Sequence, residues 1–189
     1  PKTFLAGRLF DAKGWPVMHG TLSIMDPSSK LWLDAVVRHA RTLLQDQPFL
    51  RTYTNKAHGI FVDAALMSPQ EIDPKQGFDF HDPCYNDITT RQVAFAAALK
   101  RALGPSIPVV ANCGGRPGWD ALALLVDGVM WEGYFGAPAL SLGERWRSQF
   151  DRLRAGQEAR PGVSHLLLTY GPPESDLVHR NFCVASMLL

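Results

Sequence analysis

The chain has 189 residues, of which 46% are hydrophobic and 20% are charged, a composition typical of a globular domain with one sizeable core. Lys and Arg (19) nearly balance Asp and Glu (18), and no basic stripe is interleaved with aromatic residues, so we expect no nucleic-acid partner. No apolar stretch approaches the roughly 18 to 20 residues of a membrane-spanning helix, and the first residues lack the apolar core of a signal peptide.

The three cysteines, Cys84, Cys113 and Cys183, are an odd number without C-x-x-C spacing. This pattern favours free thiols over a disulfide framework or a zinc site. Cys113 follows a predicted strand, but no histidine stands near it in the sequence as an activating base, so an inert thiol is the favoured interpretation.

The first predicted strand covers residues 22–25 and is followed by Asp26 and Pro27. An aspartate followed by a proline is typical of a helix N-terminus, because the carboxylate caps backbone N–H groups and proline fits the first helical position. The helix after them has an apolar face at helical spacing, formed by Leu33, Val36, Val37, Ala40 and Leu43 or Leu44.

A second strand is predicted at residues 59–63, followed by a polar loop at 68–87 that is long enough to be functional. His81 and Asp82 are adjacent in this loop, but no third ligand has recognisable metal-site spacing. We therefore expect no metal and no other cofactor.

Thr89 and Gln92 form a capping-box pattern, which predicts a helix that begins there and ends at Gly104. The next strand, 107–111, leads into Asn112. A glycine-rich turn at 114–118 precedes a short helical piece around residues 122–125.

The rest of the chain continues the alternation. We expect a strand that ends at Glu132, a helix from Ser141 to near Gly156, a strand at 165–170 and a last helix at 176–189. A further strand is possible near Phe4. The strand residues expected to be largely buried are Ile60, Val62, Val109, Val129, Leu166 and Leu168.

Strands that alternate with helices indicate an α/β fold with a parallel sheet. An eight-stranded (β/α)8 TIM barrel takes about 250 residues, so this chain, with five or six strands, is roughly two or three units short. It is then a fragment of a single barrel domain or an open sheet. A doubly wound nucleotide-binding domain is less favoured, because residues 114–118 are the only glycine cluster and contain a proline.

Two apolar runs each end in one carboxylate, at Asp63 and at Glu132. A buried strand has no structural use for an acid, and desolvating a carboxylate costs several kcal/mol unless it is paired or lies at the open end of the strand. We therefore expect both acids at the carboxyl-terminal mouth of the sheet. Hydrolysis of a glycosidic bond uses such a pair.

The ordered series FDAKGWPV, LSIMDPSSKLW, GIFVDAAL, IPVVANCGG, DGVMWEGY, HLLLTYG and HRNFCVASMLL resembles glycoside-hydrolase TIM barrels related to endo-alpha-1,4-polygalactosaminidases. The resemblance covers nearly the whole chain. The family's closing R-x-F-x-x-A-x-x-L-L motif matches from Arg180 to Leu189. The family's beginning and last strand have no counterpart here.

The resemblance implies that Asp63 and Glu132 end barrel strands four and six. By similarity to the alpha-galactosidase clan, Asp63 is then the nucleophile and Glu132 the acid/base of a retaining mechanism. It also implies a poly- or oligosaccharide substrate and favours a secreted or periplasmic location.

Five more residues are candidates for substrate binding, each with a structural alternative. Asn112 can bind sugar hydroxyls or shape a turn. Tyr134, Tyr170 and Trp119 can stack on sugar rings or belong to the core. Asp26 can face the mouth or cap the helix after it.

The two acids have a structural alternative too, since Asp63 can cap a loop and Glu132 can accept from a backbone amide. The competing function is a non-catalytic carbohydrate-binding or scaffold barrel. The presence of both acids favours the enzyme.

Overall fold

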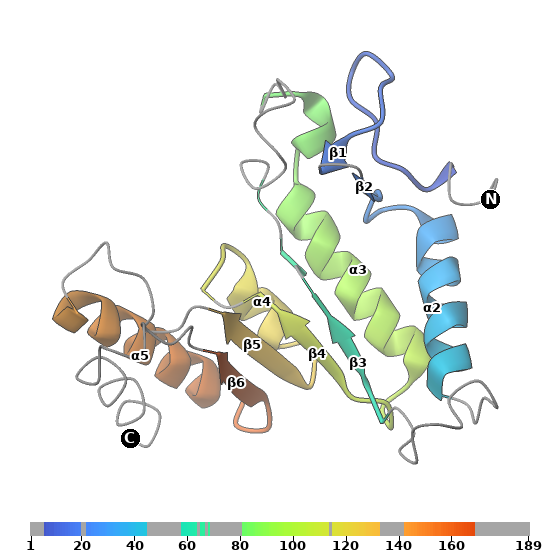
Figure 1. Ribbon diagram of the computed structural model, residues 1–189. Helices are drawn as coiled ribbons and strands as arrows, with labels where there is room; N and C mark the ends of the chain where they lie inside the picture. Colours follow the sequence, from blue (N-terminus) through green and yellow to red (C-terminus); the bar gives the residue numbers. More distant parts are fainter. Residues whose placement is uncertain are drawn as a thin grey trace, which may run out of the picture.

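The computed structural model describes most of the chain, and its elements alternate between strands and helices (Figure 1). The described residues are 6–19, 22–44, 58–63, 65–66, 68, 81–113, 115–132 and 142–168. The predicted strand near Phe4, the predicted helix 176–189, Arg180 and Cys183 lie outside them.

A four-stranded parallel sheet forms the centre of the fold. Its strands are β3 (Ile60–Val62), β4 (Val109–Asn112), β5 (Gly128–Glu132) and β6 (Ser164–Leu168). Each strand pairs with the next one along the chain, in the order β3-β4-β5-β6. The protein therefore has an α/β fold, and all four strands were predicted from their apolar runs.

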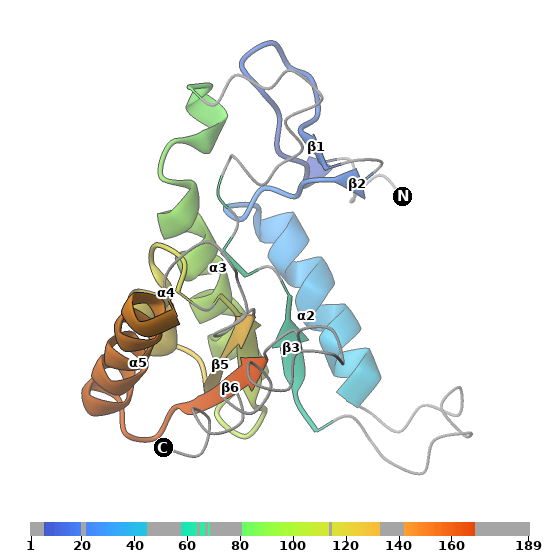
Figure 2. The same ribbon diagram turned by 60° about the vertical axis from the view of Figure 1, so that its left-hand side comes forward.

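Three helices connect these strands: α3 (Ile88–Leu103), α4 (Trp119–Ala123) and α5 (Leu142–Ala159). Crossovers between parallel strands are almost always right-handed, so strands joined in sequence order carry their helices on one face. Packing agrees, because Ala96 of α3 and Leu122 of α4 belong to one core cluster, and Leu153 of α5 packs against the same cluster. Figure 2 shows the same arrangement from a second side.

The pairing register divides the strand residues between two faces. On the face covered by helices, Val109 and Val129 are fully buried. The main core lies there and comprises Leu66, Ala96, Val109, Ala111, Cys113, Leu122, Ala123, Val126, Val129 and Trp131. The other face carries Phe61, Asn112 and Glu132, since side chains alternate along a strand.

A charged contact ties the amino-terminal edge of the sheet together. Asp127 Oδ2 lies 2.8 Å from Lys100 Nζ and accepts from the backbone N–H of Val109. Burial raises the pKa of Asp127, but the hydrogen bonds from Lys100 and Val109 and the charges of Lys100 and Arg160 outweigh burial and hold it below its ordinary value.

A smaller unit precedes the sheet. It contains the antiparallel pair β1 (Met18–His19) and β2 (Leu22–Ser23), then α2 (Lys30–Leu44), which packs against α3. The short 3-10 helix η4 (Pro83–Tyr85) closes a second core of Leu9, Val17, Tyr85 and Ile88.

This unit corrects two predictions. The strand expected at residues 22–25 is reduced to β2, and it joins β1 instead of the parallel sheet. The helix expected directly after Asp26 begins only at Lys30. Asp26 closes a turn instead, where its Oδ1 accepts from the N–H of Ser28, and Ser29 Oγ accepts from the N–H of Trp32.

The start of α3 also differs from the prediction. The helix begins at Ile88, so Thr89 lies inside it and the capping box expected from Thr89 and Gln92 is wrong. Asp87 is the residue before the helix, with a left-handed backbone (φ 55°) and no capping side-chain hydrogen bond. The predicted end at Gly104 is confirmed, because the last helical residue is Leu103 and Gly104 follows it as the C-cap. The φ of 89° at Gly104 suits a residue without Cβ.

Two of the expected core residues are exposed. Leu166 and Leu168 are 45% and 40% accessible, whereas His165 and Leu167 between them are partly buried. The prediction treated β6 as covered on both faces. The described helices cover one face only, so alternate residues of β6 remain accessible.

Among the described residues, no helix is both long and apolar enough to span a bilayer.

Candidate active site

The carboxyl ends of three neighbouring strands bring Asp63, Asn112 and Glu132 together. Asn112 is the last residue of β4, the strand between β3 and β5. Its Nδ2 donates to Asp63 Oδ1 and to Glu132 Oε2, each at 2.8 Å. The two acids, which are 69 positions apart in sequence, are thus linked by one amide group.

These hydrogen bonds limit the separation of the two carboxylates. Both oxygen atoms lie 2.8 Å from the same nitrogen, so they are no further apart than twice that length. These two oxygen atoms are thus close enough for a retaining pair, whose carboxyl groups lie about 5 to 5.5 Å apart.

The three side chains differ in exposure. Asp63 and Glu132 are exposed, whereas Asn112 is only 6% accessible. The carboxylates can therefore meet a ligand from solvent, while the amide is held among packed neighbours. Asn112 was predicted as a sugar-binding residue, and the structure shows it bound to both acids.

Two hydrogen bonds hold the loops around this trio. The N–H of Ala65, just after Asp63, donates to Asn112 O at 3.0 Å. Arg116, in the loop after β4, donates from Nη1 to Leu66 O at 2.8 Å. The segments that follow β3 and β4 are thereby fixed to each other beside the acids.

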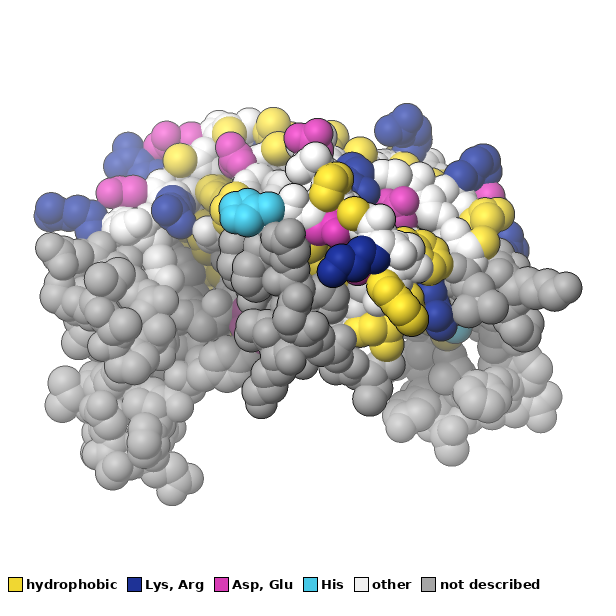
Figure 3. Space-filling model, turned by 90° about the horizontal axis from the view of Figure 1, so that it is seen from above, with side chains coloured by type: hydrophobic (Ala, Val, Ile, Leu, Met, Phe, Trp, Pro, Cys, Tyr) yellow, Lys and Arg dark blue, Asp and Glu magenta, His cyan; other side chains and the backbone are white. Residues whose placement is uncertain are grey.

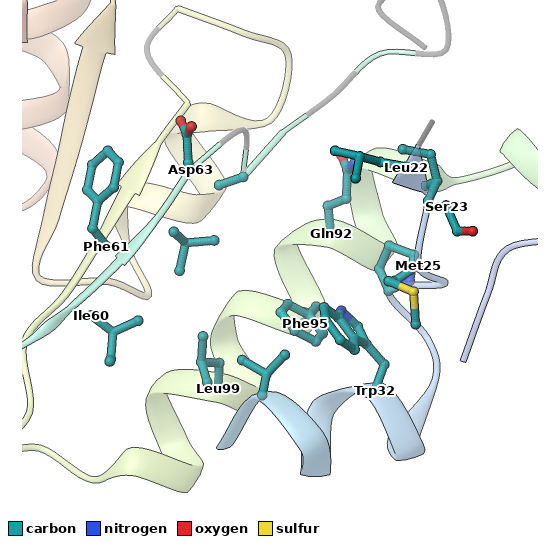
Figure 4. Close-up of a pocket in the computed structure, with 15 residues that line it drawn as sticks. Leu22, Ser23, Met25, Trp32, Ile60, Phe61, Asp63, Gln92, Phe95 and Leu99 are labelled. Carbon is teal, nitrogen blue, oxygen red and sulfur yellow. The ribbon is translucent and has the colours of Figure 1, made fainter. Parts of the chain in front are cut away.

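A cavity of about 670 Å³ borders Asp63 at the edge of the sheet that β3 forms. It lies between β3, α2 and α3, and its lining is mainly apolar, with Trp32 and Phe95 as its helix aromatics (Figure 4). In the same view, Phe61 and Asp63 project to one side of β3 and Ile60 to the other. Sequence reasoning missed Trp32 and Phe95, because nothing in their spacing distinguishes a cavity-facing aromatic from a core one.

Two other candidates lie elsewhere. Trp119 packs on Trp131 with ring centroids 4.6 Å apart, on the face that the helices cover. Asp26, in the unit before the sheet, pairs with Arg91 of α3 at 3.2 Å. A role for either in substrate binding stays a prediction, and Tyr134 and Tyr170 lie outside the described residues.

The cysteine and metal candidates can be placed as well. Cys113 is fully buried, and burial raises the pKa of its thiol to about 12 against the lowering effect of Arg116, so it is not a thiolate at neutral pH. Cys84 is also a free thiol. The described residues contain no group of three or more His, Cys, Asp or Glu placed to hold a metal; Asp82 accepts from the N–H groups of Ala12 and Cys84.

Seen from above, from the side toward which the strands of Figure 1 point, the described residues show acidic and basic side chains interspersed with hydrophobic ones (Figure 3). Such a mixture does not single out a highly charged ligand.

Comparison of the chain with models of known protein families and with curated protein sequences found no match.

Proposed function

We propose that this protein is a retaining glycoside hydrolase of the (β/α)8 barrel type, which cleaves a poly- or oligosaccharide with Asp63 as nucleophile and Glu132 as acid/base. The observation that carries the proposal is the pair of exposed carboxylates at the ends of β3 and β5, joined through Asn112. The resemblance of the ordered motifs supplies the assignment of the two roles.

The sheet topology supports the barrel. In a doubly wound sheet the strand order reverses and helices cover both faces. Here the strands follow their sequence order, and α3, α4 and α5 pack on one face. The other face carries Phe61, Leu166 and Leu168, which are 51%, 45% and 40% accessible and which barrel closure by further strands would enclose.

The mechanism follows from the two carboxylates. Asp63 attacks the anomeric carbon while Glu132 donates a proton to the leaving oxygen, and a covalent glycosyl-enzyme forms. Glu132 then removes a proton from a water molecule that releases the sugar. Phe61, which is 51% accessible and projects to the same side of β3 as Asp63 (Figure 4), offers an aromatic surface on which the C–H face of a sugar ring can stack.

The test compares two variants on two kinds of substrate. A panel of 2,4-dinitrophenyl glycosides and a panel of natural glycans are assayed by steady-state kinetics. Asp63→Asn should lower kcat by at least about 10³-fold on both, because the nucleophile is lost. Glu132→Gln should lower hydrolysis of glycans by about 10² to 10⁴-fold and spare the dinitrophenyl substrates, whose leaving group departs without a proton.

Matched controls are available on the helices. Asp120→Asn on α4 and Glu158→Gln on α5 make the same chemical changes at exposed positions and should leave turnover unchanged. Proton NMR of the first-formed sugar should show the anomer of the substrate. Near-normal turnover of Asp63→Asn, or inversion, would overturn the assigned roles. A wild-type protein that binds glycans and hydrolyses none of them would favour the carbohydrate-binding alternative.

A further inference from the structure

The position of the two acids poses a spacing problem. β3 and β5 are not neighbours, because β4 lies between them. Adjacent strands are about 4.8 Å apart, so backbones two strands apart are separated by roughly 9 to 10 Å. A retaining pair needs carboxyl groups about 5 to 5.5 Å apart, so the side chains of Asp63 and Glu132 must lean toward each other over β4.

Both acids are exposed, and their backbones are held two strands apart. A group between them has to hold both and to present positive hydrogen atoms in two directions. A primary amide has two N–H donors on one nitrogen and therefore meets both requirements.

Asn112 is placed to do this. It ends β4, the strand between the two acids, and its Nδ2 lies 2.8 Å from an oxygen of each. Its side chain is buried, and its backbone is fixed because Cα pairs with Met130 of β5 and its carbonyl accepts from Ala65 N–H. The least mobile member of the trio is therefore the amide.

We infer that Asn112 is the positioning residue of this site: its amide fixes the distance between Asp63 and Glu132 at the value a retaining mechanism needs. This inference rests on the proposed function for its catalytic consequence. It replaces the sugar-binding role expected from the sequence. It also requires two donors on one nitrogen, which aspartate at the same position lacks.

The hydrogen bonds can be tested without any substrate. In ¹H–¹⁵N spectra of the full chain, the side-chain NH2 pair of Asn112 is assigned by its loss in Asn112→Asp. Asp63→Asn should move one of the two Hδ2 resonances far more than the other, and Glu132→Gln should do the reverse. Asp120→Asn, a matched control on α4, should move neither. Two resonances that are insensitive to both acids would overturn the inference.

Kinetics then separates positioning from sugar binding. Asn112→Asp and Asn112→Ala should lower kcat about 10²-fold with KM changed less than about 3-fold, because misplacing reacting groups by an ångström costs about that much. Asn86→Asp, the same change at an exposed position, should have no effect. A raised KM with unchanged kcat would make Asn112 a sugar ligand and overturn the inference.

The two proposals fail differently. If the wild-type protein hydrolyses no glycoside, the proposed function fails, and the NMR experiment still decides whether Asn112 holds both acids. If hydrolysis proceeds and the Asn112 variants keep their kcat, the proposed function stands and the positioning role is overturned. A variant that unfolds by circular dichroism is replaced by Asn112→Ser, which keeps a polar group but cannot reach both acids.

Discussion

The two faces of the parallel sheet have different compositions and different environments. One face lies under α3, α4 and α5 and is built from residues such as Val109, Val129 and Trp131, all of them buried. The other face has exposed apolar side chains along the strands and the trio of Asp63, Asn112 and Glu132 at their ends. Stability and candidate chemistry thus depend on alternate residues of the same strands.

The largest loss of stability is expected from a substitution of Trp131 on the covered face. Trp131 is 2% accessible, contacts Trp119 and donates from Nε1 to His165 Nδ1. Trp131→Ala should lower the free energy of unfolding by about 3 to 5 kcal/mol, since it removes a large buried side chain. Urea denaturation followed by circular dichroism measures this. A loss below about 1 kcal/mol would contradict the assignment of the core to this face.

A smaller loss is expected from Gly156→Ala on α5. A Cβ at this position would lie 2.8 Å and 2.9 Å from two ring atoms of Trp119, and the Trp119 ring is backed by Trp131. Alanine would otherwise favour a helix by about 1 kcal/mol, but overpacking a core costs about 1 to 3 kcal/mol, so we expect a net loss in urea denaturation. Gly162→Ala, with nothing within 4 Å of its Cβ, is the control. Stabilisation at position 156 would show that the helices pack more loosely than described.

The covered face should also show a pH dependence through His165. Burial lowers its pKa below the ordinary 6.5, and its Nε2 is buried without a hydrogen-bond partner in the described part of the chain. The unfolded chain then binds the proton more readily than the folded protein. Stability is therefore complete above about pH 6.5 and decreases as the pH falls below that value.

Urea midpoints between pH 7 and 5 measure this dependence. His165→Gln should flatten the curve in that range, whereas His39→Gln, at an exposed position of α2, should leave it as in the wild-type protein. A curve that is unchanged by His165→Gln would show that other groups cause the dependence.

The smallest effect is expected on the open face. Leu166→Ala should change the free energy of unfolding by less than about 1 kcal/mol, because the side chain is 45% accessible. The same urea titration applies. A loss of 2 kcal/mol or more would contradict this exposure.

The sequence predicted the strands of the sheet well, because short apolar runs that end in Asp63, Asn112 and Glu132 are strong local signals. It did not predict the start of α3, where a left-handed Asp87 takes the place of a side-chain cap. It also placed residues 22–25 in the wrong kind of pairing, since local pattern does not specify a strand's partner.

The candidate site was predictable in part for the same reason. The two acids could be located at strand ends from sequence, but the double hydrogen bond of Asn112 depends on β4 lying between β3 and β5. That is a property of strand order. The packing position of Trp119 likewise depends on its contacts with Trp131 and Gly156, which belong to later elements of the chain.

The sequential pairing of the strands has a consequence for biosynthesis. Each strand of the sheet finds its partner in the strand synthesised just before it, so the sheet can grow in the direction of translation. The hydrogen-bonded trio includes no residue after Glu132, so it can form before α5 and β6 have left the ribosome. A nascent chain can thus assemble the acids and their amide first and add the last strand–helix unit to a sheet that already carries them.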